Sequence, residues 1–555
     1  MLFNSLDEIK NKTLYDVIKS YCILKKDTTA IKFENSSLNG TEFLKRIDFF
    51  ADYLFSLEIK KDDKIGILLP NCIDSVALIY ACNKIGAVAT MLNPLEKPKM
   101  LLQQINLTNC KAVFFSEISY EKVVFIATNK KNIILRGVGL LKHFNPALII
   151  GGFLKYHVMQ NKNILKRYNF NTKFLISKKS ENIDIKPCDP ALIIFSSGST
   201  DSPKAIVHSS YTINCSAFGC VVTEKENLIN VKNGCLALLP VFHIFGFNVA
   251  IHISIVAGIN LVLVAMFEKE KVAKLFLKEK FEYFPGVPTM YIKLLKSKTF
   301  RKAAIKKNYD TSGFIKGFCG GDSLPTHIQE QFNLFVKNGG GKGEIVQGYG
   351  LSEICPTSFC KIASEYQSNV GTPFDGTIIR IYNNHENKLI LSENNHEGDI
   401  YIASTGLFLG YFKNRKIDKT QFFQIDNKTW FKTNDRGFLD DNGNLHFLCR
   451  NSQVVKVSGN AINLKLIEDK LLECSLVDRA YIVAVDDEIK GSVVKAVIVP
   501  NKNLKNIDYL KNTITNFCKV NLNIWENPKY IIICQNKDIP LTPTLKPDYL
   551  LIKNL

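Results

Sequence analysis

The chain lacks the residue spacings of a structural metal site. Its 555 residues include 15 cysteines, but there is no C-x-x-C pair and no group of Cys and His at the spacing of zinc ligands. The nearest pairs, Cys215 with Cys220 and Cys355 with Cys360, are too loosely spaced for a metal. We therefore expect reduced, mostly buried thiols, as in a cytoplasmic enzyme.

Signals for secretion and for nucleic-acid binding are also missing. The N-terminal MLFNSLDEIKNK does not have the basic-then-apolar order of a secretory signal. There is no basic helix and no stripe of interleaved aromatic and basic residues, so we expect no nucleic-acid partner. The formal net charge of +19 nonetheless favours anionic partners such as nucleotides, an acidic carrier protein or a membrane surface.

Charged residues are absent from one long stretch, Gly234 to Phe267. Its length alone would permit a membrane crossing. Pro240, Gly246 and Asn248 interrupt the apolar run, so we expect a buried strand, helix and strand instead. A weaker apolar patch, Val138 to Leu154, is predicted to be a packed helix, which leaves at most peripheral membrane contact.

Apolar runs typical of buried strands alternate with helical patterns over most of the chain. The strand-like runs include KIGILLP, KAVFFS, CLALLPV and INLVLVAM, and SVALIYACNKIGAVA has a helical pattern. No fixed-period repeat is present. This alternation predicts an α/β fold, with parallel-rich sheets and helices on both faces.

Past Arg450 the pattern changes to shorter elements. A helix-like NLKLIEDKLLE is followed by strand-like AYIVAVDD and VVKAVIVP, a helical stretch near Leu510 to Val520, and a strand-like KYIIICQ. A compact α+β module of about 100 residues fits that order. We therefore predict a large N-terminal domain over residues 1–449 and a small, mobile C-terminal α+β domain over residues 450–555.

The segment SSGSTDSPK, Ser196 to Lys204, follows the strand-like run ALIIF. Hydroxyls and the backbone N–H groups of a glycine loop can surround phosphate oxygens, and a lysine adds positive charge. The segment is not the GxxxxGK[ST] loop, and Asp201 is an unfavourable neighbour for phosphate. By itself the segment fits a phosphate loop or a polar turn equally well.

Further segments, in order along the chain, resemble the core motifs of the adenylate-forming superfamily, which includes acyl-CoA synthetases, adenylation domains and beetle luciferases. After SSGSTDSPK come PVFHIFG, PGVPTMY, GGDSLP, QGYGLSE, VGTPFDG, FKTNDRG, CRNSQVVKVSG and PLTPTLK. The resemblance spans nearly the whole chain. It is greatest to the branch of fatty acyl and aryl acid CoA ligases.

The resemblance implies a two-step activity. A carboxylate attacks the α-phosphate of ATP, which releases pyrophosphate and leaves an acyl-adenylate, and a thiol then displaces AMP. Fixed donors, a lysine and Mg²⁺ suit the charge that develops on phosphate oxygens. The second step needs an acyl carbon that is open to a thiol while water is excluded.

The same resemblance assigns the nucleotide site. In QGYGLSE, Tyr349 would lie against adenine, Ser352 would contact phosphate and Glu353 would hold Mg²⁺. Asp435 would accept hydrogen bonds from both ribose hydroxyls. Without the resemblance, Tyr349 also fits an ordinary core tyrosine, and Asp435 an exposed turn. The loop residues implied to bind the β- and γ-phosphates are Ser196, Ser197, Gly198, Ser199, Thr200 and Lys204.

The C-terminal motifs carry the remaining implied roles. Arg450 matches the arginine that contacts ribose or phosphate, and Ser452 lies at the interdomain hinge. Lys546 in PLTPTLK matches the catalytic lysine that reaches the carboxylate and α-phosphate in one domain orientation only. After rotation of the small domain, the loop with Lys456, Ser458 and Gly459 would face the thiol.

Several positions depart from the family pattern. Asp201 and Leu545 each stand where glycine is usual, and Asn434 replaces a glycine before Asp435. Asn tolerates left-handed backbone angles, whereas Leu would pay about 1 kcal/mol or more if the position requires a positive φ. At the hinge, Cys449 and Ser452 also replace the usual residues. The departures make a slower enzyme, or a binder of nucleotide or acyl-adenylate without turnover, an alternative.

The acid is expected to lack an α-amino group, because His243 stands where amino-acid-activating branches usually carry an aspartate. A hydrogen-bonded core histidine is the alternative for His243. The acid pocket is expected among His243, Phe245, Gly246, Gly320, Gly321, Tyr349 and Gly350. The thiol is expected to be CoA, with the phosphopantetheine of an acidic acyl carrier protein as the alternative.

Overall fold

The protein is described from a computed structural model, which covers residues 2–140, 176–181, 183–196, 203–225, 234–359, 369–385, 388–414, 420–457, 460–487, 491–501, 507–541 and 547–555. The chain forms two compact units. The first comprises Met1–Ile379, Ile402–Phe431 and Asn442–Leu445, and the second comprises Arg380–Tyr401, Lys432–Asp441 and His446–Leu555. The predicted domain boundary at residues 449 and 450 stays a prediction.

A nine-stranded sheet runs in the order β15-β14-β13-β12-β11-β9-β10-β1-β2. Its central strands, from β13 to β1, pair parallel. The strands are β1 (Thr29–Phe33), β2 (Ser36–Asn39), β9 (Cys235–Ala237), β10 (Leu261–Leu263), β11 (Tyr283–Gly286), β12 (Lys316–Cys319), β13 (Glu344–Leu351), β14 (Cys355–Phe359) and β15 (Thr372–Pro373). The predicted parallel-rich α/β fold is confirmed.

A seven-stranded sheet has the order β19-β8-β7-β4-β3-β5-β6, and its strands from β7 to β6 pair parallel. The strands are β3 (Lys64–Leu68), β4 (Val88–Met91), β5 (Ala112–Phe115), β6 (Ile134–Gly137), β7 (Pro190–Phe195), β8 (Ala205–Ser209) and β19 (Gly410–Tyr411). Strands β7 and β8 flank the SSGSTDSPK segment and pair antiparallel.

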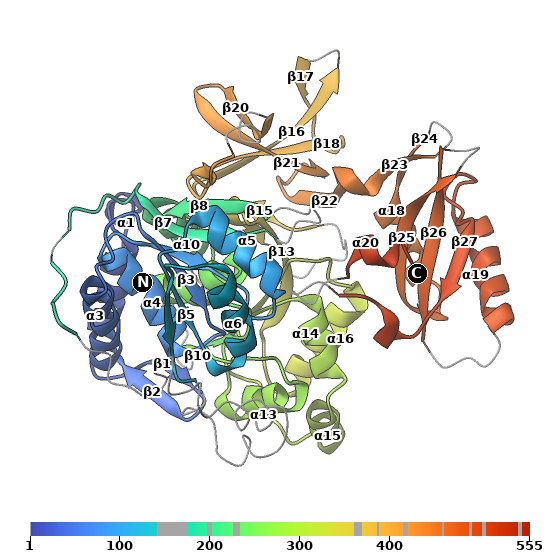
Figure 1. Ribbon diagram of the computed structural model, residues 1–555. Coiled ribbons are helices and arrows are strands. Elements are labelled where there is room, and N and C mark those ends of the chain that lie inside the picture. Colours follow the sequence, from blue (N-terminus) through green and yellow to red (C-terminus); the bar gives the residue numbers. More distant parts are fainter. Residues whose placement is uncertain are drawn as a thin grey trace. The chain divides into compact units, whose positions relative to one another are not determined.

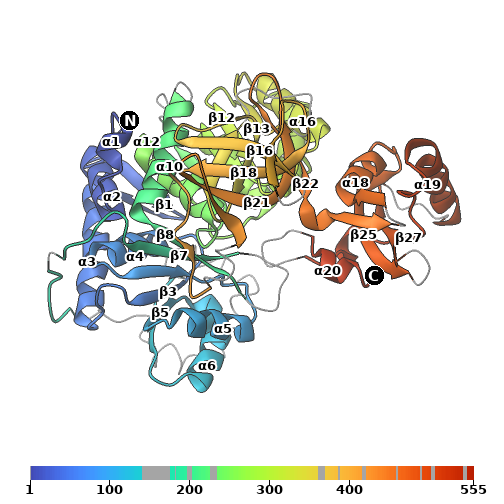
Figure 2. The same ribbon diagram turned by 90° about the horizontal axis from the view of Figure 1, so that it is seen from above.

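Helices cover both faces of this second sheet, as the alternation in the sequence predicts. Figures 1 and 2 show α3 (Gly40–Ser56) and α4 (Ile73–Lys84) on one side of β3 and β5, with α5 (Pro98–Thr108) and α6 (Tyr120–Asn129) on the other. Side chains along β5 alternate accordingly. Phe114 packs into the core beneath α3 and α4, and Phe115 packs against α5 and α6.

The stretch without charges, Gly234 to Phe267, folds as predicted into strand, helix and strand. Strands β9 and β10 enclose a π-helix, Phe245–His252, which continues as α12, Ile253–Ala257. His252 is fully buried, and its ring nitrogens lie 2.8 Å from the Tyr80 hydroxyl and 2.8 Å from Asn214 Oδ1. None of the helices in the described ranges is long and apolar enough to cross a membrane. The predicted helix at Val138 to Leu154 lies mostly outside the described residues.

A six-stranded sheet has the order β17-β16-β18-β21-β20, with β22 paired to β21. Its strands are β16 (Thr377–His385), β17 (Lys388–Leu391), β18 (Gly398–Ser404), β20 (Phe422–Ile425), β21 (Lys428–Leu439) and β22 (Leu445–Arg450). The remaining helices of the first unit are α1 (Leu6–Ile9), α2 (Leu14–Leu24), α10 (Ser210–Thr223), α13 (Lys269–Glu279), α14 (Pro288–Leu295), α15 (Lys298–Lys306) and α16 (Thr326–Asn338).

The C-terminal elements follow the predicted order of helix, two strands, helix and strand. The sheet β25-β26-β27 has a core on each face: Ile482 packs with α18 and α19, whereas Tyr481 and Val483 pack with α20. A short hairpin of β23 and β24 precedes α18. The bounds are β23 (Val454–Val457), β24 (Asn460–Asn463), α18 (Leu464–Leu472), β25 (Val477–Asp487), β26 (Gly491–Pro500), α19 (Ile507–Asn521), β27 (Tyr530–Ile533) and α20 (Tyr549–Ile552).

Glu468, a buried residue of α18, connects the C-terminal helix α20 to this sheet. Glu468 Oε1 accepts hydrogen bonds from the Ile482 backbone N–H at 2.9 Å and from the Tyr549 hydroxyl at 2.8 Å. Burial raises the pKa of Glu468 to about 7, although Lys465 acts in the opposite direction. The folded form therefore holds this proton more tightly than the unfolded chain does.

The raised pKa of Glu468 predicts that the second unit loses stability as the pH rises. Between pH 4.5 and 7 the folded unit binds more protons at Glu468 than the unfolded chain, so its free energy of unfolding falls across that range. Glu468→Gln should remove the slope. The measurement is amide hydrogen exchange of residues 464–487, corrected for the intrinsic exchange rate at each pH. Glu473→Gln, an exposed position near the same helix, should keep the slope, and equal slopes in all three proteins would contradict the prediction.

Candidate active site

Four of the predicted motifs lie at the carboxyl ends of neighbouring parallel strands. PVFHIFG follows β9, PGVPTMY begins at the end of β11, GGDSLP follows β12, and QGYGLSE occupies the end of β13. Because parallel strands end at the same edge of a sheet, segments far apart in the sequence converge there. Ligands of open α/β sheets bind at this edge.

Ser352 and Glu353 lie in the tight turn between β13 and β14. The turn closes with a hydrogen bond from the Ile354 N–H to the Leu351 carbonyl at 3.2 Å. The next residue, Cys355, is buried and has a φ of 67°. A left-handed residue after a short turn is the usual end of such a hairpin, and glycine is the residue that adopts it without strain.

Gly350 allows this hairpin to close. A Cβ at Gly350 would lie 2.7 Å from the Cys355 carbonyl oxygen and 3.0 Å from Pro356 Cα. The ladder between β13 and β14 has an irregularity between Tyr349 and Gly350, and Tyr349 is buried. The sequence analysis places Gly350 in the expected acid pocket, and the described contacts explain the glycine by the close approach of its own hairpin partner.

A buried histidine holds the backbone of the turn. His208, in β8, places Nε2 2.8 Å from the Ser352 carbonyl oxygen and Nδ1 3.2 Å from Thr212 Oγ1. Burial lowers the pKa of His208 to about 4, although the hydrogen bond to Ser352 acts in the opposite direction. The imidazole is therefore neutral at pH 7, with the Nε2–H donating to the carbonyl.

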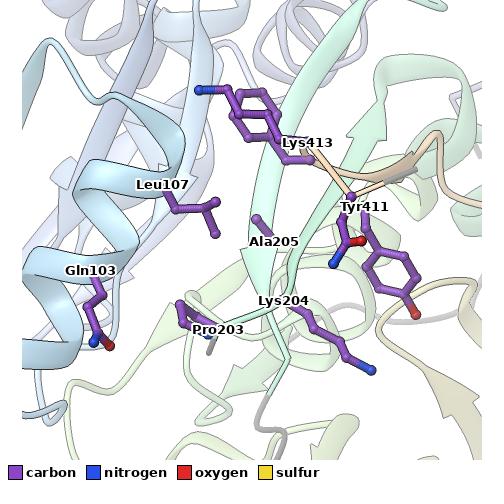
Figure 3. A pocket seen from close by; sticks show the side chains of 9 residues that line it. Gln103, Leu107, Pro203, Lys204, Ala205, Tyr411 and Lys413 are labelled. Carbon is purple, nitrogen blue, oxygen red and sulfur yellow. The ribbon is translucent and has the colours of Figure 1, made fainter. Parts of the chain in front are cut away.

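The carboxylate of Glu353 meets the end of the SSGSTDSPK segment through a tyrosine. The Tyr411 hydroxyl lies 2.8 Å from Glu353 Oε1, and Lys204 Nζ lies 5.7 Å from the centroid of the Tyr411 ring. Figure 3 shows the Lys204 amine and the Tyr411 hydroxyl pointing the same way, with the Lys413 amine pointing away from them. Lys204 and Tyr411 line a cavity with a volume of about 340 Å³. Its other lining residues are Gln103, Leu107, Pro203, Ala205, Phe412, Lys413 and Asn414.

Some of the predicted acid-pocket residues also come together. A Cβ at Gly320 would lie 3.3 Å from Phe245 Cζ, so the Phe245 ring packs on Gly320. The ring nitrogen Nδ1 of His243 accepts a hydrogen bond from the Phe245 N–H at 3.2 Å. Gly321 has a φ of 80°, which glycine tolerates. Gly246 packs against its own chain, because a Cβ there would lie 2.0 Å from the Pro240 carbonyl oxygen.

In the second unit, Asp435 and Arg450 lie close together. Asp435 is buried, and its Oδ1 lies 3.8 Å from Nε of Arg450, whose side chain is exposed. The N–H of Asp435 donates to Thr433 Oγ1 at 3.1 Å. The preceding residue, Asn434, has a φ of 61°, so the asparagine that replaces glycine does adopt the left-handed conformation.

Several predicted site residues lie outside the described residues, and their roles stay predictions. They are Ser197, Gly198, Ser199, Thr200, Asp201, Ser458, Gly459, Leu545 and Lys546. Ser196 ends the described part before the loop, where its N–H donates to the Lys204 carbonyl at 3.2 Å. The backbone of Ser452 and of Lys456 is described, in the turn before β23 and in β23 itself.

The residues present fit a magnesium ion that is shared with a substrate. Within the described ranges, no three His, Cys, Asp or Glu side chains gather as a metal site. Mg²⁺ is commonly held by one or two carboxylates together with substrate phosphates. Glu353 lies in the β13–β14 turn, and Tyr411 links its carboxylate to Lys204. Glu353 would supply that oxygen ligand, and the ion would offset charge on the phosphates.

His208 and Tyr411 were missed by the sequence reasoning. His208 follows SSGSTDSPK by only four positions, but a histidine in an apolar strand gives no sign of its partner. Tyr411 stands in FLGYF, more than fifty residues after Glu353. The antiparallel pairing of β8 with β19, with Tyr411 opposite Ile206, brings both to the turn.

The chain also matches two protein-family models. The family described as AMP-binding enzyme matches residues 23–412, which include the turn, the loop and Tyr411. The chain belongs to this family. The family's C-terminal domain matches residues 466–546.

Relatives of this AMP-binding enzyme include CoA ligases. The chain is 25% identical to a long-chain-fatty-acid–CoA ligase of Bacillus subtilis, over 90% of this chain and 87% of the relative. It is 24% identical to a 4-coumarate–CoA ligase of Vanilla planifolia, over 80% of this chain and 76% of the relative. Both relatives are matched over most of their length.

Solved structures of similar fold include an anthranilate CoA ligase in complex with anthranoyl-AMP, with a TM-score of 0.78, 18% identity and coverage of 99% of this chain and 98% of that chain. Another is the o-succinylbenzoate CoA synthetase of Bacillus subtilis, with a TM-score of 0.75, 19% identity and coverage of 98% and 99%. At this identity the likeness establishes the fold.

The hairpin geometry predicts that Gly350→Ala lowers activity and stability together. The added Cβ meets backbone atoms that cannot move without shifting the Ser352–Glu353 turn. A displacement of about 1 Å at such a site can cost on the order of 100-fold in rate. The measurements are acid-dependent exchange of pyrophosphate into ATP and thermal unfolding.

Gly340→Ala is the control, because a Cβ there has nothing within 4 Å and only the left-handed φ of 83° is strained. This variant should lose about 1 kcal/mol of stability and keep its activity. Equal loss of activity in both variants would contradict the role given to Gly350.

Proposed function

We propose that this AMP-binding enzyme activates a carboxylic acid without an α-amino group, of the fatty or aryl class, and transfers the acyl group to CoA. ATP and the acid form an acyl-adenylate and pyrophosphate, and the CoA thiol then displaces AMP. The observation that carries the proposal is the meeting of Lys204, Tyr411 and Glu353, which joins the end of the loop to the β13–β14 turn.

The chemistry of these groups supports adenylation. Lys204 supplies a cation beside the loop, and Glu353 supplies an oxygen ligand for Mg²⁺. The neutral His208 fixes the Ser352 carbonyl, so the Ser352 hydroxyl starts from a defined backbone position. Donors that are fixed before the reaction can stabilise charge on phosphate oxygens without reorganisation.

The proposal gives Asp435 and Arg450 the ribose contacts and gives Lys546 the catalytic role. Asp435 has a buried carboxylate beside an exposed arginine, which suits a ligand with two neighbouring hydroxyls. Lys546 belongs to the matched motif PLTPTLK. Ser452 serves as the hinge, and the segment from Lys456 to Gly459 receives the thiol.

The nature of the acid rests on His243 and Phe245. Neither side chain offers the carboxylate that an α-ammonium group would need, and the Phe245 ring packs on Gly320 beside β13. An apolar chain or ring fits such surroundings. The relatives named above, a fatty acid ligase and a coumarate ligase, belong to the same two classes of acid.

The first test is a panel of acids with hydroxylamine as the trap for acyl-adenylate. Fatty, benzoic and cinnamic acids should give hydroxamate in the presence of ATP and Mg²⁺, and α-amino acids should not. Substitution of CoA for hydroxylamine should give the acyl-CoA and AMP. Transfer to a carrier protein but not to CoA would overturn the proposed acceptor, and the absence of hydroxamate with every acid would overturn the proposed enzyme.

Lys546 is tested separately from the second step. Lys546→Ala should lower pyrophosphate exchange by at least about 100-fold, because one charged group that contacts the transition state is lost. Transfer from pre-formed acyl-adenylate to CoA should change by less than about threefold, since the lysine serves only the first step. Lys553→Ala, in the same C-terminal segment, should leave both rates unchanged, and unaltered exchange in Lys546→Ala would remove the assignment.

A further inference from the structure

The Ser352–Glu353 turn belongs to the nine-stranded sheet, but its contacts come from the edge of the seven-stranded sheet. Strands β8 and β19 pair antiparallel at that edge, with Val207 opposite Gly410 and Ile206 opposite Tyr411. Strand β8 also follows the SSGSTDSPK segment directly in the sequence. One ribbon therefore carries the end of the loop and the residues that reach the turn.

The ribbon holds the turn at consecutive residues. His208 Nε2–H donates to the Ser352 carbonyl at 2.8 Å, and the Phe408 N–H donates to the Glu353 carbonyl at 2.8 Å. The Tyr411 hydroxyl lies 2.8 Å from Glu353 Oε1. Backbone and carboxylate of Glu353 are thus both bound from the same short segment, Phe408 to Tyr411.

We propose that Tyr411 is a positioning residue, which holds the Glu353 carboxylate at a fixed position relative to Lys204, at the end of the phosphate loop. His208 supports the same turn through the Ser352 carbonyl. This inference rests on the proposed function, because it assumes that Glu353 and the loop act on ATP. Tyr411 itself acts through Glu353.

The chemistry of the phenol fits this role. The Tyr411 oxygen lies near two acceptors, Glu353 Oε1 and Gln421 Oε1, the latter at 2.9 Å. A phenol has one proton to donate, and a bond to a carboxylate is about twice as strong as a bond to a neutral acceptor. The proton therefore goes to Glu353. The bond fixes the rotation of the carboxylate about its Cγ–Cδ bond, so its other oxygen keeps a constant direction.

The ring of Tyr411 makes a second interaction, with Lys204. Lys204 Nζ lies 5.7 Å from the ring centroid, within the range of an attraction between a cation and an aromatic face. Figure 3 shows the hydroxyl and the amine on the same side of the cavity. Any shift of Tyr411 would therefore move the carboxylate and the lysine together.

The backbone support from His208 persists over the working range of pH. A neutral imidazole donates at Nε2 and accepts at Nδ1, which matches its two partners, the Ser352 carbonyl and Thr212 Oγ1. Its low pKa, caused by burial, keeps it neutral above about pH 5. We therefore expect His208 to stay neutral between pH 6 and 8.

Tyr411→Phe tests the proposal with the smallest possible change. Pyrophosphate exchange should fall by about tenfold in kcat, with less than a twofold change in KM for the acid. The Mg²⁺ concentration at half-maximal rate should rise by at least threefold. A second readout without turnover is the rise in melting temperature that ATP produces, titrated with Mg²⁺, whose midpoint should shift by the same factor.

Tyr309→Phe is the matched control. Its hydroxyl also makes a 2.8 Å hydrogen bond, to the Phe335 carbonyl, in a helical part of the same unit that does not touch the turn. Tyr309→Phe should leave the exchange rate and the Mg²⁺ midpoint unchanged. If Tyr411→Phe gave the same values as Tyr309→Phe, the tyrosine would be an ordinary structural residue and the proposal would fall.

Variants of His208 test the positioning role independently if Tyr411→Phe does not fold. His208→Gln keeps an N–H donor and should retain at least a third of the exchange rate, whereas His208→Ala should lose about tenfold. Equal rates for Gln and Ala, or a limb near pH 6.5 in the wild-type profile that His208→Gln removes, would overturn the assigned role.

Glu353→Gln separates failure of the inference from failure of the proposed function. If Glu353→Gln retains full exchange, the assignment of Glu353 to the reaction is wrong. If Glu353→Gln abolishes exchange while Tyr411→Phe behaves as Tyr309→Phe does, the proposed function stands and only the positioning role is lost.

Discussion

Parallel pairing of β9, β11, β12 and β13 is the constraint on which the candidate site depends. Parallel strands end at one edge of their sheet, so the segments that follow them are adjacent whatever their separation in sequence. PVFHIFG and QGYGLSE, about a hundred residues apart, meet there for this reason. The strands between them, β11 and β12, are buried.

The site also needs the second sheet. The turn of β13 and β14 carries Ser352 and Glu353, but the groups that bind this turn lie on β8 and on the segment around β19. The SSGSTDSPK segment is joined to β8 without any linker. Contacts between two sheets therefore set the distance between Lys204, at the end of this segment, and the Glu353 carboxylate, which neither sheet could set alone.

Local strain occurs at the same turn. Cys355 has a φ of 67° although it is not glycine, and it is fully packed. Asn434, beside the buried Asp435, is also left-handed. For cysteine this conformation costs about 1 kcal/mol or more, whereas asparagine tolerates it, so surrounding contacts must hold Cys355 in place. Asn434 precedes Asp435, and Cys355 follows Glu353 by two positions, so both lie near residues with proposed roles, where strain is commonly found.

Much of the fold and of the family could be predicted from the sequence, because short-range patterns carry that information. Alternating strand and helix patterns predicted the α/β fold, and the ordered motifs predicted the family, because both depend on residues close together in the chain. The uncharged stretch from Gly234 to Phe267 was likewise interpreted correctly as strand, helix and strand.

Tertiary structure alone decided how the site is supported. His208 and Tyr411 have no mutual spacing that marks them, since the pairing of β8 with β19 and the approach of another sheet bring them to Glu353. The structural reason for Gly350 is also visible only in the structure, because the carbonyl of Cys355 fills the space that a side chain would need. Sequence determined which residue types are present, and long-range packing decided which of them touch, because hydrogen bonds and close contacts depend on distance in space.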